Sequence, residues 1–173
     1  LKRKPSPPKV QLSIMNKLLL SLTVLGTIFI TASFVVPSEE KESEQGINWV
    51  TIEEAQELTK QEPRKIIMDV YTDWCGWCKK MDKTTFADEN VVKYVNQNFY
   101  AVKFNAEADK KFNFKGQEFS NPEFTRALRV GGYPTVVFFS EDFGKFQPVS
   151  GYRKADEFLK MLETFNQAEP AGR

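Results

Sequence analysis

The sequence contains no histidine and only two cysteines. The missing imidazole excludes a histidine general base, a histidine metal ligand and the Ser/His or Cys/His nucleophile pairs. Two cysteines fall short of the four sulfur or nitrogen ligands that a structural zinc site usually needs. Lys79 stands where the C-x-x-C-H motif of haem attachment requires histidine. We therefore expect neither a metal site nor a haem.

Acidic residues are absent from positions 1–36, which hold five lysines and arginines. The net charge of the whole chain is +1, so residues 37–173 carry a net charge of −4. A mildly acidic body without a basic stripe argues against nucleic acid as a partner.

The N-terminal part predicts export. Residues 1–14 are basic and proline-rich, either a short cytosolic tail or the product of an upstream start site. Residues 15–36 open with Met15-Asn16-Lys17 and continue as an uncharged run, which is typical of a signal peptide but is also long enough to span a bilayer. A cleaved signal and a retained anchor both stay open, and a buried core helix fits the flanking charges less well. Residues 37–47 read as a polar linker, and residues 48–168 as the folded domain.

Hydrophobic patterning in residues 48–168 predicts an α/β domain. Residues 65–72 are rich in β-branched side chains, which favours a buried central strand, and residues 99–105 alternate like a half-buried strand. Asp69 interrupts the first run; from sequence alone it either points to solvent or is held in the core for a functional reason. Further strands are expected at 136–139 and 146–149, and a hairpin is expected at 111–119 with its turn at Lys115-Gly116. Helices are expected after Thr51, which forms a capping box with Glu54, and at Asn121-Pro122, with Asn121 as cap. Three more helices are expected around the cysteines, after Asp88 and at about 154–166.

The two cysteines, Cys75 and Cys78, form a C-x-x-C pair between the predicted strand and a predicted helix. At a helix start the first sulfur lies near free backbone N–H groups that stabilise a thiolate, and the second lies one turn away. This arrangement suits thiol–disulfide exchange, with Cys75 as nucleophile and Cys78 as resolving thiol. An inert structural disulfide and half of an intermolecular metal site are the alternatives.

The segment Trp74-Cys75-Gly76-Trp77-Cys78-Lys79 resembles the active site of thioredoxins, and the similarity continues through most of residues 48–166. The resemblance implies a thioredoxin-like fold, with a central mixed sheet of four or five strands and helices on both faces. It also implies that Asp69 is buried and takes or relays the proton of Cys78, and that Lys103 on the next strand accompanies it. The residues implied to contact substrate are Trp74, Gly76, Trp77, Tyr133 and Pro134, the last expected to be a cis proline.

Three departures from the family pattern stand out. Trp77 replaces the usual proline between the cysteines, which should change the redox potential and the shape of the docking face. Lys83 stands where the following helix usually has a proline. Residues 108–129 resemble an insertion found in exported thioredoxin-like proteins.

The resemblance and the N-terminal segment together predict an exported thiol–disulfide oxidoreductase, periplasmic or otherwise extracytoplasmic, that reduces or isomerises protein disulfides. It would need no cofactor besides its own redox-active disulfide. Its partners would be client proteins with cysteines and a membrane electron donor, and it would touch the membrane only through a retained N-terminal anchor. Two alternatives remain: a thioredoxin-fold binding module with little turnover, and a disulfide-forming oxidant.

Overall fold

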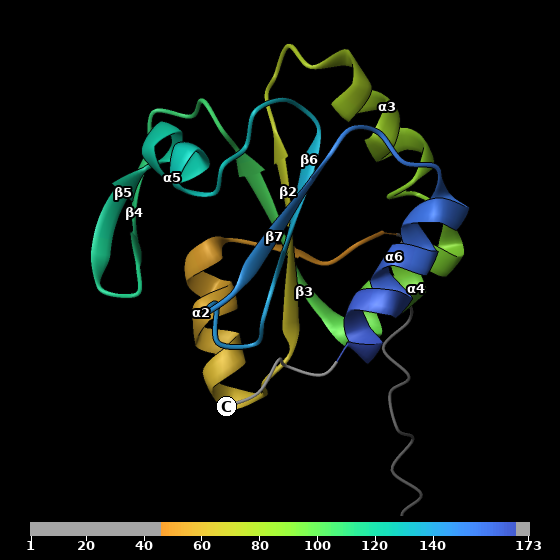
Figure 1. The fold of residues 1–173 in the computed structure, drawn as a ribbon, viewed down its shortest axis with the longest axis horizontal. Helices are drawn as coiled ribbons and strands as arrows, with labels where there is room; N and C mark the ends of the chain where they lie inside the picture. Colours follow the sequence, from red (N-terminus) through yellow and green to blue (C-terminus); the bar gives the residue numbers. More distant parts are fainter. Residues whose placement is uncertain (1–45, 169–173) are drawn as a thin grey trace, which may run out of the picture. The chain divides into compact units, whose positions relative to one another are not determined.

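The computed structural model describes residues 46–168, and its central element is a five-stranded mixed sheet (Figure 1). The strand order is β1-β3-β2-β6-β7; β1, β3 and β2 are parallel, β6 runs antiparallel to β2, and β7 runs antiparallel to β6. The strands are β1 (Trp49–Val50), β2 (Lys65–Tyr71), β3 (Phe99–Asn105), β6 (Thr135–Phe139) and β7 (Phe146–Ser150), with β4 (Lys111–Phe114) and β5 (Gln117–Ser120) in a separate hairpin. The helices are α2 (Ile52–Gln61), α3 (Gly76–Thr84), α4 (Glu89–Asn98), α5 (Asn121–Ala127) and α6 (Ala155–Gln167).

Each face of the sheet carries its own apolar core. On β2, Ile66, Met68 and Val70 point to the face covered by α2, α5 and the hairpin. Ile67 points to the opposite face, where it packs in one cluster with side chains of α3, α4 and α6. Figure 1 shows α2 and the hairpin on one side of the sheet and α3, α4 and α6 on the other. Because both faces are covered, β2 is buried along almost its whole length, as its sequence predicts.

Local sequence signals begin the helices. Thr51 and Glu54 form a reciprocal capping box at α2, and the carboxylate of Asp88 accepts the N–H groups of Asn90 and Val91 at α4. The predicted cap of α5 is wrong by one residue. Ser120 is the cap, and its backbone N–H and hydroxyl both donate to Glu123. Asn121 lies inside the helix, and its amide donates to the carbonyl of Asn105 at 2.7 Å.

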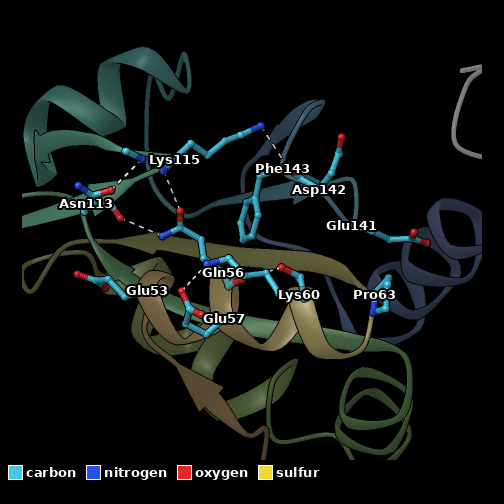
Figure 2. Close-up of a pocket in the computed structure, with 12 residues that line it drawn as sticks. Glu53, Gln56, Glu57, Lys60, Pro63, Asn113, Lys115, Glu141, Asp142 and Phe143 are labelled. Atoms are coloured by element: carbon cyan, nitrogen blue, oxygen red, sulfur yellow. Dashed lines mark hydrogen bonds and ion pairs between the residues drawn. The ribbon is translucent and has the colours of Figure 1, made fainter.

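The hairpin packs against the domain through phenylalanine rings. Phe124 of α5 lies 5.1 Å from Phe112 and 4.7 Å from Phe114 (ring centroids), and 5.8 Å from Phe104 of β3. Gln56 of α2 holds the hairpin turn. Its amide donates to the carbonyl of Asn113 at 2.9 Å and accepts the N–H of Lys115 at 2.8 Å (Figure 2). The inserted segment is therefore part of one core of the domain.

The expected tail at 1–14 and the signal or anchor at 15–36 lie outside the described residues, as does nearly all of the expected linker at 37–47. Within residues 46–168, no helix is both long and apolar enough to cross a bilayer.

Candidate active site

Cys75 and Cys78 form a disulfide at the start of α3, with their Cα atoms 5.3 Å apart. β2 ends at Tyr71, and three residues lead to Cys75, which is the N-cap of α3. Both cysteines are buried. Neighbouring Trp74 and Trp77 are 67% and 57% exposed, so apolar surface is presented to solvent on both sides of the disulfide.

The surroundings of Cys75 favour a thiolate at that sulfur. Cys75 Sγ accepts the backbone N–H of Cys78 at 3.1 Å, as an N-cap side chain does. The helix dipole adds positive potential at the same point. In the reduced protein, the same N–H group and the same dipole would stabilise a negative charge on Cys75. Cys78 lies in the first turn of α3 and is buried in the interior.

Asp69 is buried in β2, and its carboxylate pairs with Lys103. The two residues are aligned across the parallel strands β2 and β3, and Asp69 Oδ2 lies 2.7 Å from Lys103 Nζ. Asp69 is only 2% exposed and lies on the same sheet face as Ile67, the face covered by α3. Its second oxygen, Oδ1, is buried without a hydrogen-bond partner. The residues alone left open whether this acid points to solvent or into the core. In the structure it points into the core, beneath the helix that carries the cysteines.

The electrostatics of the pair follow from its burial. Desolvation raises the pKa of the Asp69 carboxyl above its ordinary value, and the nearby Lys103 ammonium opposes this increase only in part. Burial alone would lower the pKa of Lys103, but the carboxyl groups of Asp69 and Asp82 outweigh it and raise that pKa. Lys103 therefore stays charged, and Asp69 can take up a proton more readily than an exposed aspartate.

Lys103 has a second acidic partner that the sequence reading missed. Its ammonium also forms an ion pair with Asp82 of α3, so it bridges β2 and α3. Three aromatic rings surround the ammonium: the centroids of Trp49, Tyr71 and Phe86 lie 4.9, 5.1 and 5.2 Å from Nζ. No local pattern marks Asp82, because the pairing depends on how α3 lies over the sheet.

Tyr133 and Pro134 lie at the same end of the sheet as the disulfide. β6 is antiparallel to β2, and Thr135 at its start pairs with Val70 near the end of β2. The Tyr133–Pro134 peptide bond is cis. The ring of Tyr133 meets that of Trp74 edge-on, with centroids 5.9 Å apart. The structure thus brings together the residues proposed to contact substrate.

One hydrogen bond and one aromatic contact hold the exposed tryptophans. The indole N–H of Trp74 donates to Glu107 at 2.8 Å, and Trp77 packs against Tyr152 with ring centroids 5.5 Å apart. Lys80 Nζ lies over both of these last rings, 4.8 Å from Trp77 and 5.2 Å from Tyr152. No local motif singles out Glu107 or Tyr152, which reach their tryptophans only through the fold, whereas Lys80 lies three residues after Trp77 on α3.

A model of the thioredoxin-like domain matches residues 52–166 of this chain. The chain belongs to the thioredoxin-like family. The predicted fold is thereby confirmed, and the thioredoxin-like site at Cys75 and Cys78 lies within the matched segment. Its curated relatives include proteins named for thiol:disulfide interchange.

Among those relatives is the thiol:disulfide interchange protein DsbD of Actinobacillus pleuropneumoniae serotype 5b, 32% identical over 109 residues. The match covers 62% of this chain but only 17% of that protein, so the chain spans a small part of the relative's length. Among solved structures, the DsbH oxidoreductase matches with a TM-score of 0.58 and 20% identity, covering 72% of this chain and 88% of that one. The oxidised C-terminal domain of Neisseria meningitidis DsbD matches with a TM-score of 0.51 and 23% identity, covering 65% and 90%. At these identities, the two structures support the fold alone.

Within residues 46–168, no three Cys, Asp or Glu side chains are grouped so that they could hold a metal ion. A groove of about 1010 Å³ lies between α2, the hairpin turn and the turn after β6 (Figure 2). The sheet register places the turn after β6 near the start of β2, away from the cysteines.

Proposed function

We propose that this chain is an exported thiol–disulfide oxidoreductase that reduces or isomerises disulfides in client proteins. The observation that carries the proposal is the asymmetry of the two sulfurs. Cys75 is the N-cap of α3 and accepts a backbone N–H, whereas Cys78 faces the interior on the side of the sheet that holds Asp69. One sulfur is thus placed to attack, and the other to resolve.

In the first step, the Cys75 thiolate attacks one sulfur of a client disulfide. A new disulfide forms between Cys75 and the client, the client's own disulfide breaks, and the client's second sulfur leaves as a thiolate that takes a proton from water. Trp74, Gly76, Trp77, Tyr133 and Pro134 would hold the client segment across the site.

In the second step, Cys78 loses its proton to the Asp69 carboxylate and attacks Cys75. The Cys75–Cys78 disulfide forms, the mixed disulfide breaks, and the client leaves with both cysteines reduced. Two electrons have then moved from the dithiol to the client. Lys103 would keep Asp69 in place and limit the rise of its pKa.

The proposed reaction needs no cofactor besides the dithiol, but it needs a source of electrons. Outside the cytosol, a membrane protein that delivers electrons to Cys75–Cys78 would regenerate the dithiol. The name of the DsbD relative, a thiol:disulfide interchange protein, supports this type of chemistry. The expected signal or anchor at residues 15–36 supports an extracytoplasmic, periplasmic location.

Insulin reduction tests the enzymatic part of this proposal. With dithiothreitol as electron donor, we expect the wild type to accelerate precipitation of the insulin B chain. Cys75→Ser and Cys78→Ser should both reduce the rate to that of dithiothreitol alone. Equal rates for wild type and Cys75→Ser would reject the enzyme and favour a binding module with little turnover.

The redox potential tests the direction of electron flow. Equilibration with glutathione at known ratios gives the potential of the Cys75–Cys78 pair. A reductase should lie near the thioredoxin value of about −270 mV, and an oxidant near about −120 mV. A value at the oxidising end would replace the reductase by a disulfide-forming oxidant on the same dithiol.

A further inference from the structure

A cationic aromatic cluster lies on the Trp77 side of the disulfide. It consists of Trp77 and Lys80 of α3 and Tyr152 from the turn between β7 and α6. The rings of Trp77 and Tyr152 pack at 5.5 Å, and the ammonium of Lys80 lies over both. The hydroxyl of Tyr152 is 3.1 Å from that of Thr84, which fixes the turn against α3.

The charge of Lys80 is not neutralised by the described part of the protein. No ion pair within residues 46–168 involves Lys80, and the ammonium is held over ring faces instead of a carboxylate. The one acid of α3, Asp82, is occupied by Lys103. The same surroundings contain four further basic residues and two acidic residues in the first turn of α6. The basic residues are Lys79, Lys83, Arg153 and Lys154, and the acidic residues are Asp156 and Glu157.

The other side of the disulfide has the opposite sign. There the exposed ring of Trp74 is bound by the carboxylate of Glu107, and Asp73 precedes it in the turn. Each side therefore offers an exposed tryptophan, but one tryptophan is paired with a cation and the other with an anion. A client segment lying across Cys75 would meet different charges at its two ends.

We propose that Lys80, Tyr152 and Trp77 form a subsite that binds an acidic residue of the client near its disulfide. This inference rests on the proposed function, because it names the substrate class of the same site. Lys80 is five residues beyond Cys75, which corresponds to about 7.5 Å along a helix. An extended chain covers that distance in two to three residues. The acidic residue should therefore lie two or three positions from the attacked cysteine.

Model peptides with one cysteine test this selectivity. The cysteine is joined by a disulfide to 2-mercaptoethanol, and the positions two and three residues away are both Glu, both Gln or both Lys. These substitutions lie on the N-terminal side of the cysteine in one set of peptides and on the C-terminal side in the other, so that the acidic side near Trp74 does not cancel the effect of Lys80. Reduced protein is mixed with each peptide at low ionic strength, and the second-order rate constant is measured by quenching and chromatography. Each value is divided by the rate constant with dithiothreitol, which corrects for the intrinsic reactivity of the disulfide.

In the set whose substituted side meets Lys80, we expect the wild type to prefer the Glu peptide over the Lys peptide by about threefold to tenfold, because one exposed charge contact contributes modestly and the exchange turns attraction into repulsion. Lys80→Gln should bring the ratio close to one, and Lys80→Glu should reverse it. Lys93 on α4 is an exposed lysine without a described partner, so Lys93→Glu is the matched control and should leave the ratio unchanged.

The outcomes separate the two proposals. If the wild type reduces the Gln peptide but shows no preference between Glu and Lys, the subsite is rejected and the oxidoreductase stands. The same holds if Lys80→Glu changes the ratio no more than Lys93→Glu does. If the wild type reduces no peptide faster than a Cys75→Ser control, the proposed function fails, and the subsite fails with it.

Discussion

At the scale of single residues, the proposed mechanism depends on a carboxylate that is buried away from water. Asp69 has one oxygen on Lys103 and the other buried without a partner. Such a group is costly for the fold, since burial disfavours its charged form. A proton acceptor for a buried thiol is a reason to retain it there.

The first prediction concerns the role of Asp69 in resolution. Asp69→Asn should slow the attack of Cys78 on the mixed disulfide by about 10- to 100-fold at pH 7, because the amide cannot accept the proton. In the wild type the rate should fall as the pH falls through the raised pKa of Asp69, since the protonated carboxyl is no longer a base. The variant should lack that decrease. Stopped-flow measurement of mixed-disulfide resolution over pH gives both results.

Asp73→Asn is the matched control for this measurement. Asp73 is an exposed acid in the turn before the cysteines, bonded to the amide of Asn105. Its substitution should leave the pH profile of resolution intact. If Asp69→Asn resolves as fast as Asp73→Asn at every pH, Asp69 does not accept the proton.

The second prediction concerns stability and follows from the same pKa. Because the pKa of Asp69 is raised in the folded state, its contribution to stability is fully present below the unfolded pKa of about 3.9 and is lost as the pH rises through the folded value. Asp69→Asn avoids this loss. The free energy of unfolding of the variant, relative to that of the wild type, should therefore rise with pH, by about 1.4 kcal/mol for each unit of pKa increase.

Urea unfolding of the oxidised proteins between pH 4 and 8 measures this difference without titration of the thiols. A difference that stays constant with pH, or that favours the wild type more strongly at high pH, would show that Lys103 outweighs desolvation at Asp69.

At the scale of elements, the inserted hairpin joins the core through Phe124. This ring lies within 6 Å of four other phenylalanines, including Phe104 of the central sheet. The phenylalanines of this segment therefore serve as local core. A surface for partners on the hairpin would have to use its polar residues.

The third prediction tests that coupling. Phe124→Ala should lower the free energy of unfolding by about 3 to 5 kcal/mol, and Phe124→Leu by less, because leucine leaves a smaller cavity. Phe146 is 40% exposed on the edge strand β7, so Phe146→Ala is the control and should cost far less. Comparable values for Phe124→Ala and Phe146→Ala in urea unfolding would mean that the insertion folds apart from the sheet.

At the scale of the whole molecule, the sequence predicted the elements better than their contacts. The β-branched run of β2 and the alternation in β3 are local signals, and both strands lie where these signals place them. The two-residue strand β1 has no such signal, because it exists only through its pairing with β3. The cap of α5 was misassigned to Asn121, although Ser120 with Glu123 three residues later has the form of a capping box.

The residues of the candidate site also divide into those that the sequence predicts and those that only the structure reveals. Its cysteines and their tryptophan neighbours are contiguous in the chain, so the motif reveals them. Asp69, Lys103 and Pro134 were found through the family resemblance, which carries information about the fold. Asp82 and Tyr152 are brought in by the packing of α3 on the sheet and against the turn before α6, and neither motif nor spacing indicates them. Lys80 lies three residues after Trp77 on α3, a helical spacing that could have indicated their contact.

In the proposed mechanism, Cys75 attacks a client disulfide and Cys78 resolves the mixed disulfide that forms. Trapping of the mixed disulfide tests this claim most directly. Cys78→Ser and Cys75→Ser are each incubated with a disulfide-containing client, and the adducts are identified by mass spectrometry without reduction. We predict that Cys78→Ser accumulates a covalent adduct at Cys75 and that Cys75→Ser accumulates little. Equal adducts in both variants, or an adduct only at Cys78, would contradict the account.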